Sequence, residues 1–300
     1  MPHRKKQFEA GLKRLLDSAA MGVYLEPEQK LDARDESVLK DVESYIVDDP
    51  YFELLNTNHL TCDVPSGIHI SSDLINGYPV EYARQVTPRR FRLYYDTPML
   101  DGFHCGVEVR IEHPGPTEHG HKKPFKQVVK IGGPATSKDH TFHRIEISGR
   151  IASSIPSFEA ETLDGNGKLA GFLSDSLDVA NFRPLQLLAT VRTRIWCRPD
   201  GDANTIVEFG IDRGRGITFD GHQYSILQIE PELIHGDPAA LNDVSDKLME
   251  RFSGALTVNL TSKPTPGYNH LAAVLKDDKV MRHAARRLKV PEFNLLAAPR

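Results

Sequence analysis

The chain has few of the residues that would indicate a disulfide framework, a zinc centre or a membrane protein. It contains three cysteines, Cys62, Cys105 and Cys197, which lie far apart and form no C-x-x-C pair. A cytoplasmic protein with reduced thiols is therefore expected. No run approaches the roughly 18 apolar residues that a membrane span requires. Residues 1–18 are basic but lack an apolar stretch, so they predict an amphipathic helix and not a signal peptide.

The sequence also lacks an excess of positive charge. Its formal net charge is −4, so the composition predicts no broad attraction to nucleic acid or to an anionic membrane. Hydrophobic residues at 39% and charged residues at 26% are typical of a soluble globular protein. Any anion-binding site must therefore come from a local cluster of basic residues.

What the sequence does contain is a series of segments in which charged and apolar residues alternate. In residues 225–236, Gln228, Glu230 and Glu232 fall on one side, whereas Leu227 falls on the other. A period of two is the period of a β-strand. The same kind of alternation recurs in residues 23–31, 91–113, 125–133, 143–151, 187–199 and 205–214.

The order of these segments predicts the fold class. Strands follow one another through turns, without the alternating βαβ order of a parallel sheet. We therefore predict an α+β fold with seven or eight antiparallel strands, arranged as a sheet or a barrel. Helical spacing of apolar residues predicts helices over 5–20, 33–47, 168–180, 237–252 and 270–289.

Two arrangements of the charged strand faces fit this pattern. The charged faces can point into solvent around an aliphatic core, or they can line a shared interior while the aliphatic faces pack under helices. A charged interior must be wet, cross-paired or filled by a ligand, because unpaired buried charge is costly. The acidic candidates are Glu26, Glu28, Glu146, Glu208, Glu230 and Glu232, and the basic ones are Lys30, Arg110, Lys130, Arg144, Arg192 and Arg194.

Acidic and basic groups sharing one interior suit a complex of a metal ion with a polyphosphate. Carboxylate oxygens are the ligands that Mg²⁺ and Mn²⁺ prefer. Arginine and lysine side chains neutralise phosphoryl oxygens. Phosphoryl transfer needs little beyond positioning and charge stabilisation, so such an interior is able to catalyse it.

Several segments resemble, in the same order, the motifs of the CYTH family, the triphosphate tunnel metalloenzymes, which include class IV adenylate cyclases and thiamine triphosphatases. The similarity covers roughly residues 23–35 and 91–270. The matching segments are EPEQK (26–30), YYDTP (94–98), GVEVRI (106–111), KQVVKIGG (126–133), HRIEI (143–147), VRTRIW (191–196), VEFGIDRG (207–214), QIEPELIHGDPAAL (228–241) and SKPTPGY (262–268).

The resemblance implies an eight-stranded antiparallel closed β-barrel, a tunnel flanked by helices, over residues 23–270. Residues 1–22 and 271–300 are then helical extensions, and 48–88 and 152–184 are insertions. Lys30 and Glu28 match catalytic positions. The implied ligands of Mg²⁺ or Mn²⁺ are Glu26, Glu28, Glu146, Glu208, Glu230 and Glu232, and the implied phosphate-binding residues are Arg110, Lys130, Arg144, Arg192, Arg194 and Lys263.

Three positions depart from the pattern of the family. Gln228 replaces the first of three alternating glutamates, Glu112 replaces the second arginine of an R-x-R strand, and Pro266 stands where an arginine is usual. These departures bear on substrate and activity more than on fold.

The leading functional hypothesis is a metal-dependent hydrolase of a small-molecule triphosphate, such as inorganic triphosphate or ATP. The alternatives are a nucleotidyl cyclase of the same family and a binding module that holds a nucleotide or polyphosphate without turnover. An RNA 5′-triphosphatase is a further member of this class, but the acidic balance offers no track for nucleic acid. No membrane partner is expected, and a homodimer is left open.

Overall fold

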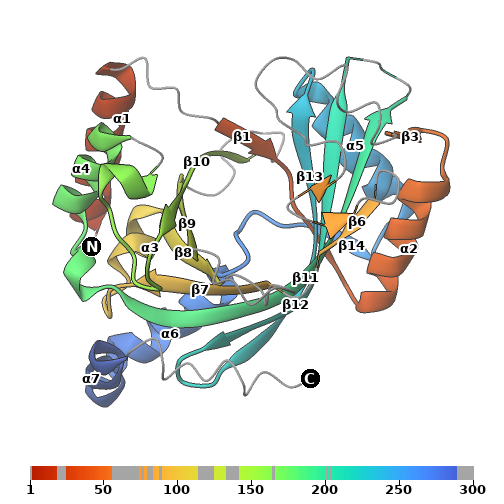
Figure 1. Cartoon of the computed structure of the whole chain (residues 1–300). Helices are drawn as coiled ribbons and strands as arrows, with labels where there is room; N and C mark the ends of the chain where they lie inside the picture. Colours follow the sequence, from red (N-terminus) through yellow and green to blue (C-terminus); the bar gives the residue numbers. More distant parts are fainter. Residues whose placement is uncertain are drawn as a thin grey trace.

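The computed structural model describes residues 2–18, 25–55, 74–75, 78–79, 84–87, 90–113, 125–132, 142–163, 166–200, 202 and 204–288. Twelve strands in this part of the chain form one strongly curved antiparallel sheet, and most of the helices pack on its outer side (Figure 1). This architecture confirms the predicted α+β class. None of the helices in these ranges is long and apolar enough to cross a bilayer.

The bounds of the strands follow the predicted alternating segments. The strands are β1 (Leu25–Glu28), β2 (Leu31–Ala33), β3 (Phe52–Leu54), β4 (Leu74–Ile75), β5 (Tyr78–Pro79), β6 (Arg84–Val86), β7 (Arg90–Asp96), β8 (Val107–His113), β9 (Phe125–Ile131), β10 (Phe142–Ile151), β11 (Arg183–Pro199), β12 (Ile206–Thr218), β13 (Gln223–His235) and β14 (Leu256–Val258). Their order in the sheet is β1-β10-β9-β8-β7-β11-β12-β13-β2-β14. Strands β3 and β6 pair with β11, and β4 and β5 pair with each other.

The two ends of the strand path come together at β1 and β13. Glu28 lies opposite Glu232, and the backbone N–H of Gln29 donates to the carbonyl of Pro231 over 2.9 Å. One register pair is too little to establish a closed barrel, so the closed tunnel of eight strands stays a prediction.

The helices are α1 (Pro2–Ser18), α2 (Glu36–Asp48), α3 (Asp101–Cys105), α4 (Gly167–Ser176), α5 (Ala239–Arg251), α6 (Thr265–Asp277) and α7 (Lys279–Arg287), with 3-10 turns at Ala160–Leu163 and Val179–Asn181. Most of them cover the outer face of the sheet, whereas α6 packs on the inner face against Gln186 and Tyr224. In Figure 1, α1 and α4 lie over β8–β10, and α2 and α5 lie over β12 and β13.

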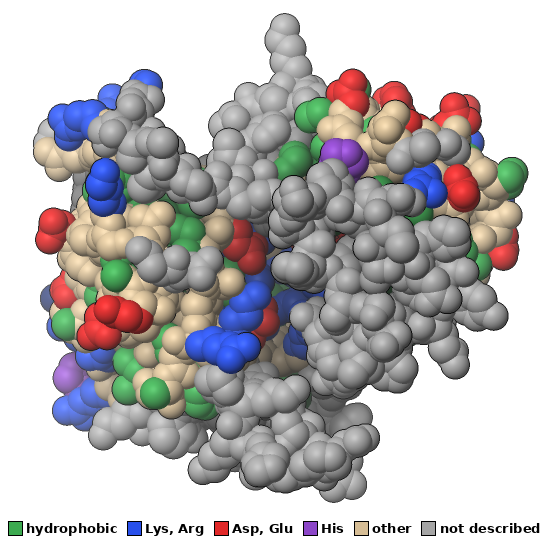
Figure 2. Space-filling model, turned by 45° about the horizontal axis from the view of Figure 1, so that its top comes forward, with side chains coloured by type: hydrophobic (Ala, Val, Ile, Leu, Met, Phe, Trp, Pro, Cys, Tyr) green, Lys and Arg blue, Asp and Glu red, His purple; other side chains and the backbone are tan. Residues whose placement is uncertain are grey.

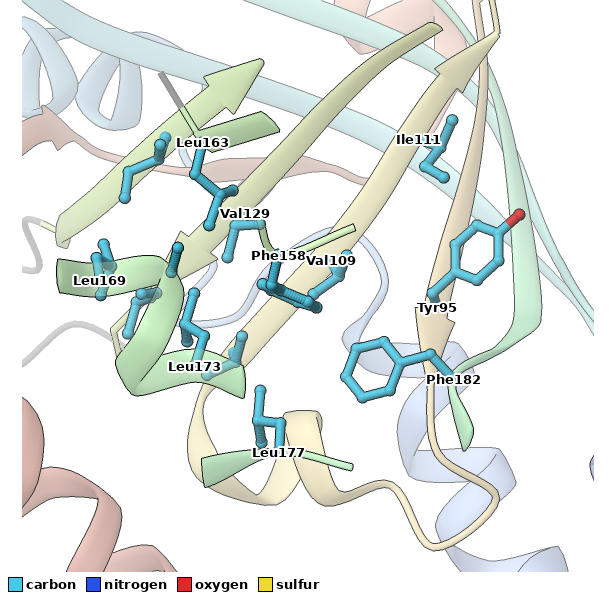
Figure 3. Packing of buried hydrophobic residues seen from close by; sticks show 14 of the residues in the cluster. Tyr95, Val109, Ile111, Val129, Phe158, Leu163, Leu169, Leu173, Leu177 and Phe182 are labelled. Atoms are coloured by element: carbon cyan, nitrogen blue, oxygen red, sulfur yellow. The ribbon is translucent and has the colours of Figure 1, made fainter. Parts of the chain in front are cut away.

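Aliphatic residues on the outer face make the hydrophobic core. On β8 and β9, Val109, Ile111 and Val129 are buried beneath α4, where Leu169 and Leu173 point inward (Figure 3). A second cluster joins the outer faces of β12 and β13 to α2 and α5, and the alternating charged residues face away from these two clusters. A third cluster lies on the same face as the charged residues, where Leu188, Tyr224 and Ile226 pack with residues of α6.

The turn after β7 is shaped by a buried aspartate. Asp96 is fully buried and accepts hydrogen bonds from the backbone N–H groups of Thr97, Gly102 and Phe103 over 2.7–2.8 Å. Burial raises the pKa of Asp96 to about 7, against the lowering effect of these three N–H donors. The aspartate of YYDTP thus holds the start of the short helix α3, which the sequence did not predict, between β7 and β8.

Two predicted elements differ in detail from the structure. The predicted strand over 23–31 is two strands, β1 and β2, separated by Gln29 and Lys30. The predicted helix over 270–289 is also two helices, because Asp278 ends α6 and caps α7 by accepting from the N–H groups of Val280 and Met281. Cys62, the side chain of Glu26 and most of the segment 48–88 lie outside the described part of the chain.

Candidate functional site

The inner face of the curved sheet carries a dense network of buried ion pairs. Figure 2 shows Lys and Arg side chains gathered with Asp and Glu in a hollow at the middle of the molecule. The members come from β1 and the residues that follow it, from β7–β13 and from the segment that precedes α6. Some ion pairs cross an intervening strand, such as Arg144 on β10 with Glu108 on β8 at 3.7 Å across β9, so these side chains lie on one face of the sheet.

Glu230 on β13 is the centre of this network. Its carboxylate lies 2.8 Å from Lys30 Nζ and 2.6 Å from Lys263 Nζ, and it also pairs with Arg192. Only 6% of Glu230 is exposed. Burial opposes its ionisation, but the surrounding Lys263, Lys30 and Arg192 hold the pKa of Glu230 well below its usual range.

Asp212 on β12 binds two of the same bases. Arg192 donates to both of its carboxylate oxygens, and Lys263 Nζ lies 2.9 Å from Oδ2. The guanidinium of Arg192 lies over Gly210, where an added Cβ would come within 2.8 Å of Arg192 Cζ. Glycine at 210 therefore leaves the room that Arg192 needs between Asp212 and Glu230.

A row of three glutamates crosses the inner face next to this centre. Glu28 on β1 lies opposite Glu232 on β13, which lies opposite Glu208 on β12. Like charges directly opposite one another on neighbouring strands repel. Basic side chains compensate this repulsion: Lys30 lies 3.1 Å from Glu28, which also pairs with Arg144. Arg194 lies 3.0 Å from Glu208.

The opposite wall, on β8–β10, carries a second set of pairs. Lys130 Nζ lies 2.5 Å from Glu146 Oε2, and Arg110 lies 3.2 Å from Glu112. Lys130 is close enough to the first set to lower the pKa of both Glu28 and Glu230. The two walls therefore act on a common space.

The structure brings the predicted residues together, apart from Glu26, whose side chain lies outside the described part. Two further members were not predicted. Asp212 shares the inward face of β12 with Glu208, and Arg92 on β7 lies 3.3 Å from Glu112 and donates to Thr190 Oγ1. The period-two alternation of strand residues could have identified both. Arg92 lies two positions before Tyr94 and Asp212 two positions after Gly210, so each faces inward with that neighbour.

Burial and charge act in opposite directions on the bases of the site. Burial lowers the pKa of Lys263 to about 8, against the raising effect of Asp212 and Glu230. Burial also opposes protonation of Arg192, but Asp212 and Glu230 outweigh it and raise the pKa of Arg192 well above its usual value. Both bases therefore remain largely protonated at neutral pH and are suited to bind anions.

The paired carboxylates make the stability of the folded protein depend on pH in the acid range. Burial raises the pKa of Glu146, but Lys130 and Arg110 outweigh it and lower that pKa from 4.5 to about 2. A lowered pKa contributes stability above the unfolded value that is lost as pH falls through the folded value. We expect the contribution of Glu146 to the melting temperature to be fully present above about pH 5 and to be lost steadily from about pH 4.5 to about pH 2.

Thermal denaturation followed by circular dichroism across this range tests that expectation. Glu146→Gln should flatten part of the decline, because glutamine does not titrate. A melting temperature that stays constant down to about pH 2.5 would show that the inner ion pairs contribute nothing to stability.

The carboxylates of the site are of the type that divalent metals bind, but the described residues form no ready-made metal site. Among the described residues, no three His, Cys, Asp or Glu side chains converge as a group of metal ligands. The carboxylates of Glu28, Glu208 and Glu232 nevertheless stand on three neighbouring strands and offer the oxygen ligands that Mg²⁺ and Mn²⁺ prefer. To bind a metal, Glu28 and Glu208 would exchange a basic partner for the ion.

No protein-family model and no curated protein matches the sequence. Several solved structures are similar to the chain. One is a putative adenylate cyclase from Bacillus halodurans, which is 14% identical, with a TM-score of 0.46, over 82% of this chain and 98% of that one. Another is the putative adenylyl cyclase HpAC1 from Hippeastrum, described with a dominant triphosphatase activity, at 14% identity, a TM-score of 0.48, and 82% and 96% coverage.

A third similar structure is the capping enzyme triphosphatase of Mimivirus, at 10% identity and a TM-score of 0.40, over 82% of this chain and 96% of that one. Putative adenylate cyclases and a triphosphatase are thus among the solved structures to which the chain is similar.

Proposed function

We propose that the chain is a divalent-metal-dependent hydrolase of a triphosphate bound inside the curved sheet. The observation that carries this proposal is the buried network centred on Glu230, in which Lys30, Arg192 and Lys263 converge on one carboxylate. Such a collection of desolvated bases matches the oxygens of a polyphosphate chain. The strands β1, β10, β9, β8, β7, β11, β12 and β13 would form the wall of the tunnel.

Binding in this proposal is an exchange of partners. In the free protein each base is neutralised by a carboxylate, so the interior is cross-paired. When the phosphates enter, the bases turn to the phosphoryl oxygens and the carboxylates are released. Mg²⁺ or Mn²⁺ held by Glu28, Glu208 and Glu232 would supply the charge that neutralises those carboxylates and polarises the phosphoryl group.

Lys30 and Glu28 are placed to position the attacking water. Lys30 is 2% exposed and lies between Glu28 and Glu230, at 3.1 and 2.8 Å. Burial opposes ionisation of Glu28, but Lys30 and Arg144 outweigh it and hold its pKa well below the usual range. Glu28 is therefore ionised and accepts a hydrogen bond from water. A loose phosphoryl-transfer transition state needs orientation more than a strong base.

The test is to incubate the purified protein with inorganic triphosphate or ATP in Mg²⁺ or Mn²⁺. We expect orthophosphate release that EDTA abolishes and added metal restores, because the released carboxylates need the cation. Pyrophosphate with a cyclic nucleotide would instead indicate a cyclase. Tight binding without any product under either metal would indicate a module that only sequesters the ligand.

A further inference from the structure

A small cavity adjoins the phosphate-binding network at the edge of β13. It measures about 180 Å³ and lies between the β13 residues Ser225–Gln228, strand β2 and the segment Asn259–Pro266. Lys263 belongs both to the wall of this cavity and to the network, where it binds Asp212 and Glu230. A triphosphate bound to Lys263 would therefore lie next to the cavity.

The register of the strands explains why the space is open. Strand β2 pairs with Gln228 and Ile229 of β13, whereas β13 begins at Gln223. The start of β13 therefore extends beyond β2, and the segment that leads to α6 crosses over it. Apolar lining comes from Ala33, Ile226 and Pro266.

One wall of the cavity is a chain of polar side chains with a free acceptor. Gln228 Nε2 donates to Asp32 Oδ1 over 3.0 Å, and Asn259 Nδ2 donates to Asp32 Oδ2 over 2.8 Å. Because the carboxylate of Asp32 must receive the NH₂ group, the amide oxygen of Gln228 is the atom left over. Gln228 is 2% exposed, and its Oε1 has no hydrogen-bond partner among the described residues.

A buried acceptor without a partner costs free energy, and it marks a position where a ligand can supply a donor. A cavity of about 150 Å³ is large enough for benzene, so this one admits a ring-sized group. Most of the lining is polar or charged, from Asp32, Arg34, Ser225, Gln228, Asn259, Ser262 and Lys263, so the cavity suits a ring that carries hydrogen-bonding groups.

We propose that this cavity binds the organic end of a triphosphate ester, a ring that carries an N–H or O–H donor and gives it to Gln228 Oε1. This inference rests on the proposed function, because the triphosphate must bind the network for its ester end to reach the cavity. It makes the substrate a nucleotide-like ester and not inorganic triphosphate, and it gives Gln228 a role in recognition.

The test compares the affinities of ATP and inorganic triphosphate by calorimetry in EDTA, where the proposed hydrolysis does not consume the ligands. The wild-type protein should bind ATP about tenfold more tightly. Ser225→Trp fills the cavity from an exposed position, and Gln228→Leu removes the acceptor. Both variants should lose the preference for ATP while the affinity for inorganic triphosphate stays within about twofold. Ser253→Trp, at an exposed position outside the cavity, is the matched control.

The outcomes separate this inference from the function on which it rests. Equal affinity of the wild type for both ligands, or unchanged ATP affinity in Ser225→Trp, overturns the cavity assignment while hydrolysis of inorganic triphosphate still supports the proposed function. A preference for ATP that Ser225→Trp removes, with no product formed, supports the cavity and overturns the hydrolase. Binding of neither ligand overturns both. Circular dichroism verifies that each variant is folded. If Gln228→Leu does not fold, the result for Ser225→Trp decides whether the cavity binds the organic end of the ester.

Discussion

Replacing Glu230 with glutamine is expected to lower turnover of a triphosphate by on the order of 10²- to 10³-fold while the protein remains folded. Glu230 holds Lys30, Arg192 and Lys263 around one point, and glutamine keeps its shape but not its charge. The three bases then repel one another, so the melting temperature should also fall by several degrees.

The same substitution removes the carboxylate that competes with the phosphates for these bases. In EDTA, inorganic triphosphate should therefore bind Glu230→Gln at least as tightly as the wild type. Glu250→Gln, an exposed change on α5, should alter neither turnover nor stability. Wild-type turnover by a correctly folded Glu230→Gln variant would remove Glu230 from the active site.

Lys130→Ala should also abolish most turnover, but through binding. Lys130 lies 2.5 Å from Glu146 and lowers the pKa of Glu28 and Glu230 from the opposite wall of the interior. Without it one phosphoryl group loses its charge partner, so we expect a loss on the order of 10²-fold in kcat/KM. Inorganic triphosphate should bind more weakly in EDTA, the reverse of the effect of Glu230→Gln.

Lys126→Ala is the matched control for this prediction. Lys126 is on the same strand and the same face, but it is exposed and acts on Glu112 and Glu146 at the edge of the network and not on its centre at Glu230. Its removal should change kcat/KM by less than about threefold. Equal losses in the two variants would show that strand β9 contributes a diffuse positive field and no specific phosphate contact.

The sequence predicted which side chains of each strand face inward, but it did not predict which strands lie next to one another. Period-two alternation identified the inward positions of β12 and β13, and Glu208 and Glu230 lie there. It does not determine which strands are adjacent, since pairing depends on tertiary packing and not on local pattern. The row of Glu28, Glu232 and Glu208, and the pairing of Lys263 with Asp212, therefore became visible only in three dimensions.

Gln228 shows how a local comparison can mislead. By its position in the motif it is a substituted metal ligand, a loss of charge on β13. In the structure the side-chain amide of Gln228 donates to Asp32 on β2. The neighbouring strand therefore supplies a carboxylate next to the position where the motif has lost one. That contact joins residues almost two hundred positions apart, and no periodicity in either segment predicts it.

On β8 and β9, hydrophobic and charged side chains lie on opposite faces. The ligand specificity of the interior can therefore change by mutation independently of the hydrophobic core. Val109, Ile111 and Val129 pack beneath α4, whereas their sequence neighbours Arg110 and Lys130 meet the interior. Randomising the even-numbered positions of β8 and β9 in a combinatorial library would therefore leave the hydrophobic packing beneath the helices unchanged. New anion preferences can be selected from such a library without first rebuilding the scaffold.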